Sequence, residues 1–201
     1  MGGDAQPQSC AGHIGMSGAG DTTSVELRID DLRGEAIIRL LHEHLRDCAT
    51  HSPPGSVHAL DLDALRRPDI TFWSAWDGDD LMGCGALREL DPAHGEVKSM
   101  RTATPHLRKG AAAAVLARII EESRRRGYRR LSIETGSMAA FEPARRLYAR
   151  HGFVACAPFG AYTDDPYSCF MTLALVEAGS SAGPGPHGSS RAARDSAQSS
   201  S

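Results

Sequence analysis

The stretch that decides the fold runs from Val97 to Leu116 and reads VKSMRTATPHLRKGAAAAVL. It predicts a β-strand over 96–102, a short loop with a proline and a basic pair, and an alanine-rich helix that begins at Gly110. The first turn of a helix has backbone N–H groups without intrahelical partners and a partial positive charge, so anions bind there. The small residues from Gly110 to Ala113 would let a pyrophosphate approach the backbone closely. Taken alone, the same pattern also fits a helix start that is closely packed for structural reasons.

The composition is that of a globular protein with a single domain. The chain has 201 residues, of which 41% are hydrophobic and 23% charged. The net charge of −3 gives no electrostatic footprint for nucleic acid, and no apolar run approaches the roughly 20 residues that span a bilayer. Five cysteines without a CxxC pair indicate reduced thiols. Since we find no secretory signal either, we expect a cytoplasmic protein that binds neither nucleic acid nor membrane.

Both ends of the chain differ in composition from its middle. Residues 1–23 and 177–201 are rich in Gly, Ser and Ala and have no hydrophobic periodicity, so we expect them to be disordered. The folded domain is therefore expected at 24–176. Within it, His42 and His44 face different sides of a predicted helix, which makes a poor metal pair, and no metal site is expected.

Hydrophobic periodicity predicts alternating strands and helices across the domain. In chain order they are a strand at 25–29, helices at 36–45 and 60–65, strands at 70–76, 81–89 and 96–102, a helix from 110, a strand at 129–135, a helix at 141–151, and strands at 153–155 and 168–175. The three consecutive strands joined by tight turns indicate an antiparallel meander. The strand–helix–strand unit that follows indicates one parallel pair. The expected fold class is α/β (α+β), with a mixed, mainly antiparallel central sheet flanked by helices.

Three segments then resemble a known family when they are taken in order. The first is the loop Leu107-Arg108-Lys109-Gly110-Ala111-Ala112, and the second is the strand RRLSIET at 129–135. The third, ARRLYARHGF at 144–153, looks like the motif A-x-x-L-Y-x-x-x-G-F. Together they resemble the GNAT-type N-acetyltransferases over about 25–176, and the segments SPPGSVHALD and KSMRT resemble a small bacterial branch of that family.

The resemblance implies acetyl-CoA as co-substrate and assigns residues to its parts. The strand backbone would hold the pantetheine arm, and the loop and helix start would hold the pyrophosphate. The implied cofactor-binding residues are Met100, Arg101, Thr102, Arg108, Lys109, Gly110, Ala111, Ala112 and Ala113. Two positions depart from the family pattern. Leu107 replaces a Gln or Arg that contacts the pyrophosphate, and Phe141 replaces an Asn near the pantetheine arm.

The resemblance also implies catalytic residues. The tyrosine that matches Tyr148 lies near the sulfur in the family and can donate a proton to the departing thiolate. Some members place a glutamate base where Glu96 begins the central strand, and Glu134 at the end of the neighbouring strand is the second candidate. Outside the motif, Tyr148 would be interpreted as a core aromatic residue. Both glutamates also fit solvated strand ends.

The acceptor side is less defined by the sequence. Loop residues that would form its two walls are His51, His58 and Asp61 on one side and Phe159, Tyr162 and Asp165 on the other, with plain loops as the default. We expect an N-acetyltransferase that acts on a primary amine of a small molecule or amino-acid-like acceptor. The alternatives are a protein lysine or N-terminal acetyltransferase and a non-catalytic acyl-CoA-binding module. By resemblance only, a homodimer is also consistent with the chain.

Overall fold

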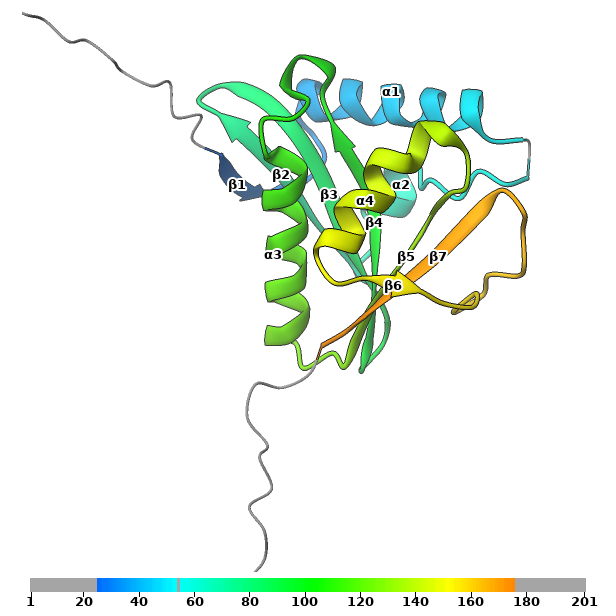
Figure 1. The fold of residues 1–201 in the computed structure, drawn as a ribbon. Helices are drawn as coiled ribbons and strands as arrows, with labels where there is room; N and C mark the ends of the chain where they lie inside the picture. Colours follow the sequence, from blue (N-terminus) through cyan, green and yellow to red (C-terminus); the bar gives the residue numbers. More distant parts are fainter. Residues whose placement is uncertain (1–24, 54, 176–201) are drawn as a thin grey trace, which may run out of the picture.

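The strands of this protein form one mixed sheet with helices on both faces (Figure 1). The computed structural model describes residues 25–53 and 55–175. Over this part of the chain the sheet has seven strands in the order β1-β2-β3-β4-β5-β7-β6, and only the β4–β5 pair is parallel. The expected mixed, mainly antiparallel α/β class is therefore confirmed. The predicted disorder of 1–23 and 177–201 concerns residues outside the described ranges.

The first four strands form the predicted antiparallel meander. They are β1 (Glu26–Ile29), β2 (Ile70–Asp77), β3 (Asp80–Asp91) and β4 (His94–Thr102). The turn between β2 and β3 contains Gly78 with a φ of 58°, a conformation that glycine adopts without steric cost. The central strand β4 begins two residues earlier than the predicted start at 96, so that it includes a buried histidine, His94.

The second half of the sheet joins the first through a short parallel contact. β5 (Arg130–Gly136) follows helix α3 (Ala111–Arg125), and β4 residues His94–Val97 pair with Arg130–Ile133. β7 (Ser168–Ala174) inserts between β5 and β6 (Val154–Ala155). Beyond this parallel contact the two central strands separate, and Figure 1 shows them converging only at one end.

A β-bulge in β4 lies at the point of separation. Cys84 pairs with Arg101 and Ala86 with Lys98, so Ser99 and Met100 together lie opposite the single residue Gly85. Ser99 has a φ of 52°, as expected for a bulged position. A Cβ on Gly85 would lie 2.5 Å from Met100 Sδ and 2.7 Å from Val115 Cγ1, so only glycine fits there. Bulges bend a strand, and this one accompanies the divergence of β4 from β5.

Two hydrophobic clusters hold the helices to the two faces. On one face, α3 and α4 (Glu142–Arg150) pack through Val115, Ile119 and Tyr148 onto core residues of β4 and β5. On the other, α1 (Glu35–His51) packs the helically spaced Ile37, Leu40 and Leu41 against β2 and β3 together with α2 (Leu62–Leu65). Two short 3₁₀ turns, Thr104–His106 and Ala139–Phe141, precede α3 and α4.

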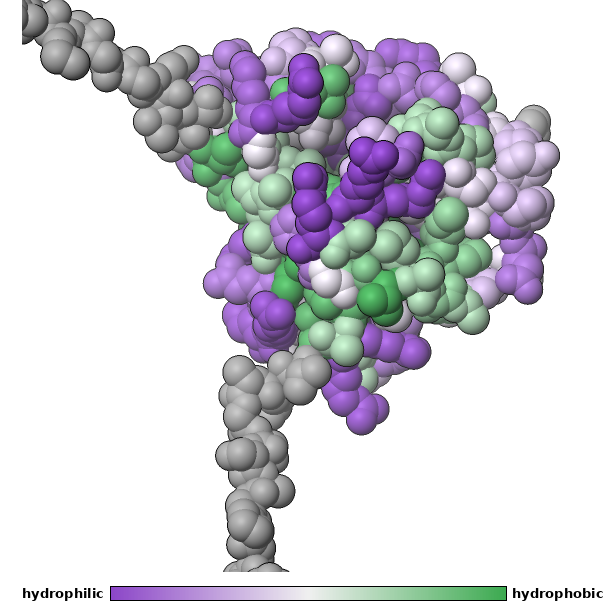
Figure 2. Space-filling view, in the orientation of Figure 1, coloured by the Kyte–Doolittle hydropathy of each residue, from purple (hydrophilic) through white to green (hydrophobic). Residues whose placement is uncertain are grey.

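The surface over α4 is hydrophilic, and apolar surface lies beside it (Figure 2). Glu142, Arg145 and Arg146 of α4 border an open depression whose other lining includes Phe170 and Met171 of β7. Because α4 shields the core with its buried face and carries charge outward, it behaves as an amphipathic surface helix.

Candidate active site

The first cavity of the site lies where β4 and β5 separate, and we call it the splay cavity. Its volume is about 90 Å³, and β4 residues 97–100 and β5 residues 133–136 form two of its walls. The α1 side chains His44 and Cys48 and the loop at 56–59 close it from the other face. β4 has no β5 partner beyond Val97, so its backbone groups there are open to a ligand.

The predicted pantetheine-binding residues reach this cavity to different degrees. Met100 lines it directly. The Arg101 side chain turns instead to α1, where its Nη2 lies 2.6 Å from Asp47 Oδ2, and Thr102 pairs with Gly83 of β3. Among these three predicted residues, Met100 is therefore the one that lines the splay cavity.

The start of α3 has the geometry of an anion site. The first helical hydrogen bond runs from Ala114 N–H to Gly110 O at 3.0 Å, so the N–H groups of Ala111, Ala112 and Ala113 have no partner within the helix. Gly110 has a φ of 91°, and a Cβ there would meet nothing within 4 Å, so the space in front of the backbone is open. These features fit a pyrophosphate that is bound by backbone amides.

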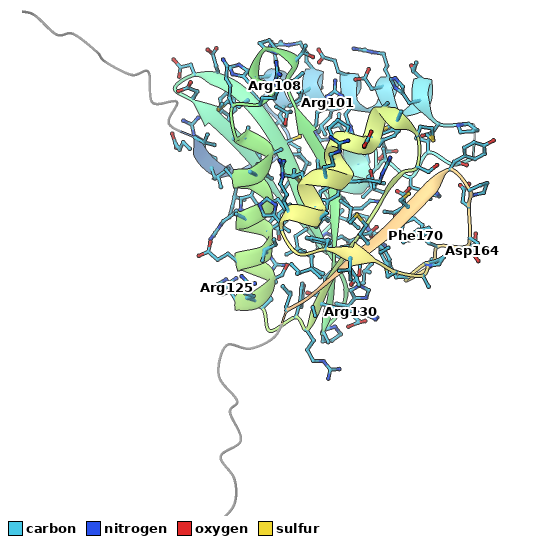
Figure 3. All side chains as sticks on the ribbon, in the orientation of Figure 1. Arg101, Arg108, Arg125, Arg130, Asp164 and Phe170 are labelled. Atoms are coloured by element: carbon cyan, nitrogen blue, oxygen red, sulfur yellow. The ribbon has the colours of Figure 1, made fainter. Side chains whose placement is uncertain are left out.

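Basic residues lie at both ends of α3 but have different surroundings. Arg108 and Lys109 are exposed in the loop that enters the helix, whereas Arg125 lies at its far end (Figure 3). Arg125 and Arg126 both bind Glu122, at 2.7 and 2.8 Å, which lowers the pKa of that carboxyl group to about 2. The distal arginines are therefore engaged with the helix itself, and the predicted pair Arg108 and Lys109 lies beside the anion site.

A second cavity, which we call the side cavity, adjoins the first. It measures about 500 Å³ and lies between the loop at 55–60, strands β3 and β4, and the loop at 159–165. Four residues line both cavities: Val57, His58, Ala59 and Lys98. A molecule in the side cavity would therefore lie next to the point where the two central strands separate.

A buried network of charged and polar groups forms one wall of the side cavity. Glu96 is only 1% exposed, and its Oε1 accepts a hydrogen bond of 2.7 Å from the Tyr162 hydroxyl. Lys98 Nζ donates to the Tyr162 oxygen at 2.8 Å and to the His58 carbonyl at 3.0 Å, and it lies 3.4 Å from Glu96 Oε1. Burial and the neighbouring Glu96 carboxylate raise the pKa of Tyr162 well above its ordinary value. The other oxygen of Glu96, Oε2, is buried and has no hydrogen-bond partner among residues 25–53 and 55–175.

Sequence reasoning named Glu96 but missed Lys98. The signal was present, because residues two apart in a strand face the same side, and a glutamate and a lysine at this spacing interrupt an otherwise buried strand. Arg88 was missed as well. It lies opposite Glu96 in the β3–β4 register and lines the side cavity.

Glu134 lines the splay cavity rather than the side cavity. Burial is the main cause of a raised pKa for this carboxyl group, while a 2.7 Å hydrogen bond from Ser168 Oγ and the nearby Lys98 act in the opposite direction. The two candidate bases therefore lie in adjoining cavities on the same side of the sheet.

Tyr148 lies deeper than either carboxylate. It is 3% exposed, packs against Phe153 with ring centroids 5.9 Å apart, and is not among the residues that line the two cavities. Burial, with a smaller effect of the nearby Glu134 charge, raises its pKa well above the ordinary value for tyrosine. The phenol is therefore protonated at neutral pH, as a proton donor must be, but is a weaker acid than a solvated tyrosine.

The predicted wall residues divide into two groups. His58, Phe159, Tyr162 and Asp165 line the side cavity. The other two have local structural contacts instead. The Asp61 side chain caps α2 by accepting from Ala64 N–H at 2.9 Å, and His51 Nδ1 bonds to the Asp47 carbonyl at 2.8 Å.

Residues 25–53 and 55–175 contain no group of three or more His, Cys, Asp and Glu side chains arranged to hold a metal ion. None of the helices described there is long and apolar enough to cross a membrane.

Comparison with known proteins agrees with this geometry. The model of the acetyltransferase (GNAT) family matches residues 38–153. The chain belongs to this family. The GNAT match spans the splay cavity, the start of α3 and Tyr148, and the recognition made from the sequence motifs is thereby confirmed.

Several relatives of this GNAT protein extend over most of its length. The chain is 60% identical over 151 residues to the uncharacterized N-acetyltransferase YsnE of Bacillus subtilis (strain 168), covering 75% of this chain and all of the relative. It is 38% identical to an IAA acetyltransferase of Azospirillum brasilense, covering 70% of this chain and 92% of the relative. The fold resembles that of a GNAT family acetyltransferase from Elizabethkingia anophelis with acetyl-CoA bound, with a TM-score of 0.52, 16% identity and coverage of 75% and 98% of the two chains.

Proposed function

We propose that this protein transfers the acetyl group of acetyl-CoA to a primary amine of a small, amino-acid-like acceptor held in the side cavity. The observation that carries the proposal is that the side cavity and the splay cavity share a wall at His58 and Lys98. A donor between the central strands and an acceptor in the side cavity would therefore meet without a covalent enzyme intermediate. A volume of about 500 Å³ suits a small molecule.

The residues of the donor half fit acetyl-CoA. Amides at Ala111–Ala113 and the exposed Arg108 and Lys109 suit its pyrophosphate, and the unpaired edge of β4 beyond Val97 suits the amides of its pantetheine arm. Leu107 is 55% exposed beside this site and contributes no polar contact. When bound, acetyl-CoA supplies the electrophilic thioester, and the work of the protein is to orient it and to move protons.

In this proposal the two proton transfers belong to Glu96 and Tyr148. The amine must be neutral to attack. Glu96 lines the side cavity and has one oxygen without a hydrogen-bond partner among the described residues, so it is the proposed base, directly or through water. Glu134 in the splay cavity is the alternative base. The protonated Tyr148 phenol is the proposed donor to the departing thiolate, which requires its hydroxyl to reach the sulfur from the α4 side.

A thiol-release assay with acetyl-CoA and a panel of small amines and amino acids tests this function. We expect acceptor-dependent release of CoA thiol and a product that is heavier by one acetyl group. Acetylation of proteins or peptides without any small acceptor would favour the protein acetyltransferase alternative. Acetyl-CoA binding without thiol release for every acceptor would favour the non-catalytic module.

Tyr148→Phe tests the role of the general acid. Removing the hydroxyl leaves the aromatic packing against Phe153 in place, so the fold should persist while the chemical step slows by about 10²–10⁴-fold. Single-turnover kinetics measure that step separately from CoA release. An unchanged rate constant would exclude Tyr148 as the donor.

A further inference from the structure

Arg88 presents an unused hydrogen-bonding edge to the side cavity. Its Nε donates to Asp69 Oδ2 at 3.2 Å, which fixes the guanidinium at the cavity wall with the side chain 31% exposed. Nη1 lies 3.8 Å from Glu96 Oε2, too far for a hydrogen bond. Within residues 25–53 and 55–175, the Nη groups of Arg88 donate no hydrogen bond, so this planar donor edge is available to a ligand.

Two cations and two carboxylates meet around this edge, and they are paired unevenly. Glu96 lies between Arg88 and Lys98, and Asp69 pairs with Arg88 through Nε. Lys98 is satisfied by Tyr162, His58 and Glu96, whereas Arg88 is satisfied only at Nε. Asp165 at the rim of the cavity accepts from the Tyr167 N–H at 2.9 Å and so is engaged by its own loop. A carboxylate on a ligand would therefore reach the Nη groups of Arg88 while Asp69 keeps its hydrogen bond to Nε.

Glu96 gives an independent indication that a ligand binds at this place. Its side chain is 1% exposed, it lines the side cavity, and its Oε2 has no hydrogen-bond partner in the part of the chain that the structure describes. A buried carboxylate oxygen without a partner is costly, so an N–H donor on a ligand would stabilise it. An acceptor oxygen without a hydrogen-bond partner and a free guanidinium edge therefore lie 3.8 Å apart at this wall, among the described residues.

From this pairing we propose that the acceptor is an amine that also carries a carboxylate, and that Arg88 binds this carboxylate while Glu96 Oε2 receives the N–H of the amine. This assignment rests on the proposed acetyl transfer and names its class of acceptor. Arginine suits the role because its planar guanidinium group donates two parallel hydrogen bonds to a carboxylate. A carboxamide or a hydrocarbon group on the ligand cannot accept both of these bonds.

The test compares amino acids with their carboxamides in the wild-type enzyme and in Arg88→Gln. Each pair keeps the amine and the shape of the acceptor and differs only in the negative charge. For the wild type we expect kcat/KM to be about ten- to hundred-fold higher for the acid than for the amide. In Arg88→Gln this preference should disappear through a raised KM for the acid, while the KM for acetyl-CoA stays the same.

Two further variants separate carboxylate binding from loss of structure. Arg67 binds the other oxygen of Asp69 at 3.0 Å and does not line the side cavity, so Arg67→Gln removes an ion pair of Asp69 without touching the acceptor. We expect this variant to keep the wild-type preference for acids. Arg88→Lys should keep part of it, because the charge remains but the fork is lost.

The outcomes decide between the two proposals. Equal use of acids and amides by the wild type, or an equal loss for both in Arg88→Gln, would overturn the role of Arg88 and leave acetyl transfer intact. If no amine is acetylated, the proposed function falls. In that case, calorimetry with the same acid–amide pairs, on the wild type and on Arg88→Gln, tests whether Arg88 binds the carboxylate. Equal affinity of both proteins for acid and amide would overturn this role of Arg88.

Discussion

At the scale of single residues, Glu96 and Glu134 project from neighbouring strands into different surroundings. One oxygen of Glu96 has no hydrogen-bond partner among the described residues, and Glu134 accepts a hydrogen bond from Ser168 in the splay cavity. We expect Glu96→Gln to lower kcat/KM by about 10²–10⁴-fold, as loss of a general base does. Glu134→Gln should retain most of the rate at pH 8. Kinetics of both variants with the same acceptor check this, and the reverse order would transfer the role to Glu134.

The raised pKa of Glu134 makes the pH profile a second readout of the same question. If the Glu134 carboxylate were required, kcat/KM would fall as the pH drops through this raised pKa, at a higher pH than an ordinary glutamate would produce. Glu134→Gln would then remove that fall along with the activity. If Glu96 is the base, as we propose, Glu134→Gln should instead keep its activity at pH values above the raised pKa of Glu134.

His44 gives the stability of the protein a specific dependence on pH. Burial, with Arg101 as the next cause, lowers its pKa to about 4, while an unfolded histidine titrates near ~6.5. As the pH falls from about 6.5 to about 4, His44 is protonated in the unfolded chain but stays neutral in the folded protein. The folded state is therefore destabilised over this pH window. The loss is at most about 3 kcal/mol.

Urea unfolding at a series of pH values measures this effect of His44. The His44→Asn variant removes the titrating group, so its free energy of unfolding should fall less between pH 7 and pH 4.5 than that of the wild type. His94 also has a pKa lowered by burial and remains in both proteins, so a residual slope is expected. Parallel curves for the two proteins would contradict the assignment.

At the scale of elements, α3 has a glycine with positive φ beyond each end, and only one of them adjoins the anion site. Gly110 and Gly127 have φ values of 91° and 76°, and a Cβ on either would meet nothing within 4 Å. We expect Gly110→Ala and Gly127→Ala to cost about 1 kcal/mol each, because alanine is strained in this conformation. Only Gly110→Ala should raise the KM for acetyl-CoA, since it disturbs the amides of the first turn. Equal KM values in the two variants would exclude this end of the helix as the pyrophosphate site.

The elements themselves were predictable because each has a local pattern. Ile37, Leu40 and Leu41 mark the buried stripe of α1, and Gly78 and Gly127 mark turns that require positive φ. The bulge at Ser99–Met100 was not predicted, because it depends on the close approach of Gly85 to Met100 and α3 rather than on the order of residues in β4. The separation of β4 from β5 follows the same long-range packing.

At the scale of the whole molecule, the two halves of the site differed in how far the sequence could predict them. The donor half lies on one continuous strand–loop–helix unit that ends at α3, so its residues were recognised together. The side cavity is built from the loop at 55–60, the Arg88–Glu96 pair and the loop at 159–165, which only the folded sheet brings together. Lys98 bridges the two halves by contacts to His58 and Tyr162, and no local pattern encodes those contacts.

The arrangement of the sheet further predicts that acetyl-CoA stabilises the entire fold. Within the described ranges, the β1–β4 half and the β5–β7 half of the sheet pair only where His94–Val97 meets Arg130–Ile133. A ligand bound between the separated strands would contact both halves and the start of α3, and it would have no such site in the unfolded chain. At a free concentration 100 times its Kd, acetyl-CoA should add about 2.7 kcal/mol to the free energy of unfolding.

For a protein of this size, that gain corresponds to a rise in Tm of about 5–11 °C, which differential scanning calorimetry can measure. The shift should grow with the logarithm of the acetyl-CoA concentration, since it follows from mass action. At equal ligand concentration the shift should be smaller for Gly110→Ala and unchanged for Gly127→Ala, because only the first substitution lies at the anion site. A Tm that does not respond to acetyl-CoA, or a shift that both substitutions reduce alike, would mean that the ligand does not bind between β4 and β5 at the start of α3.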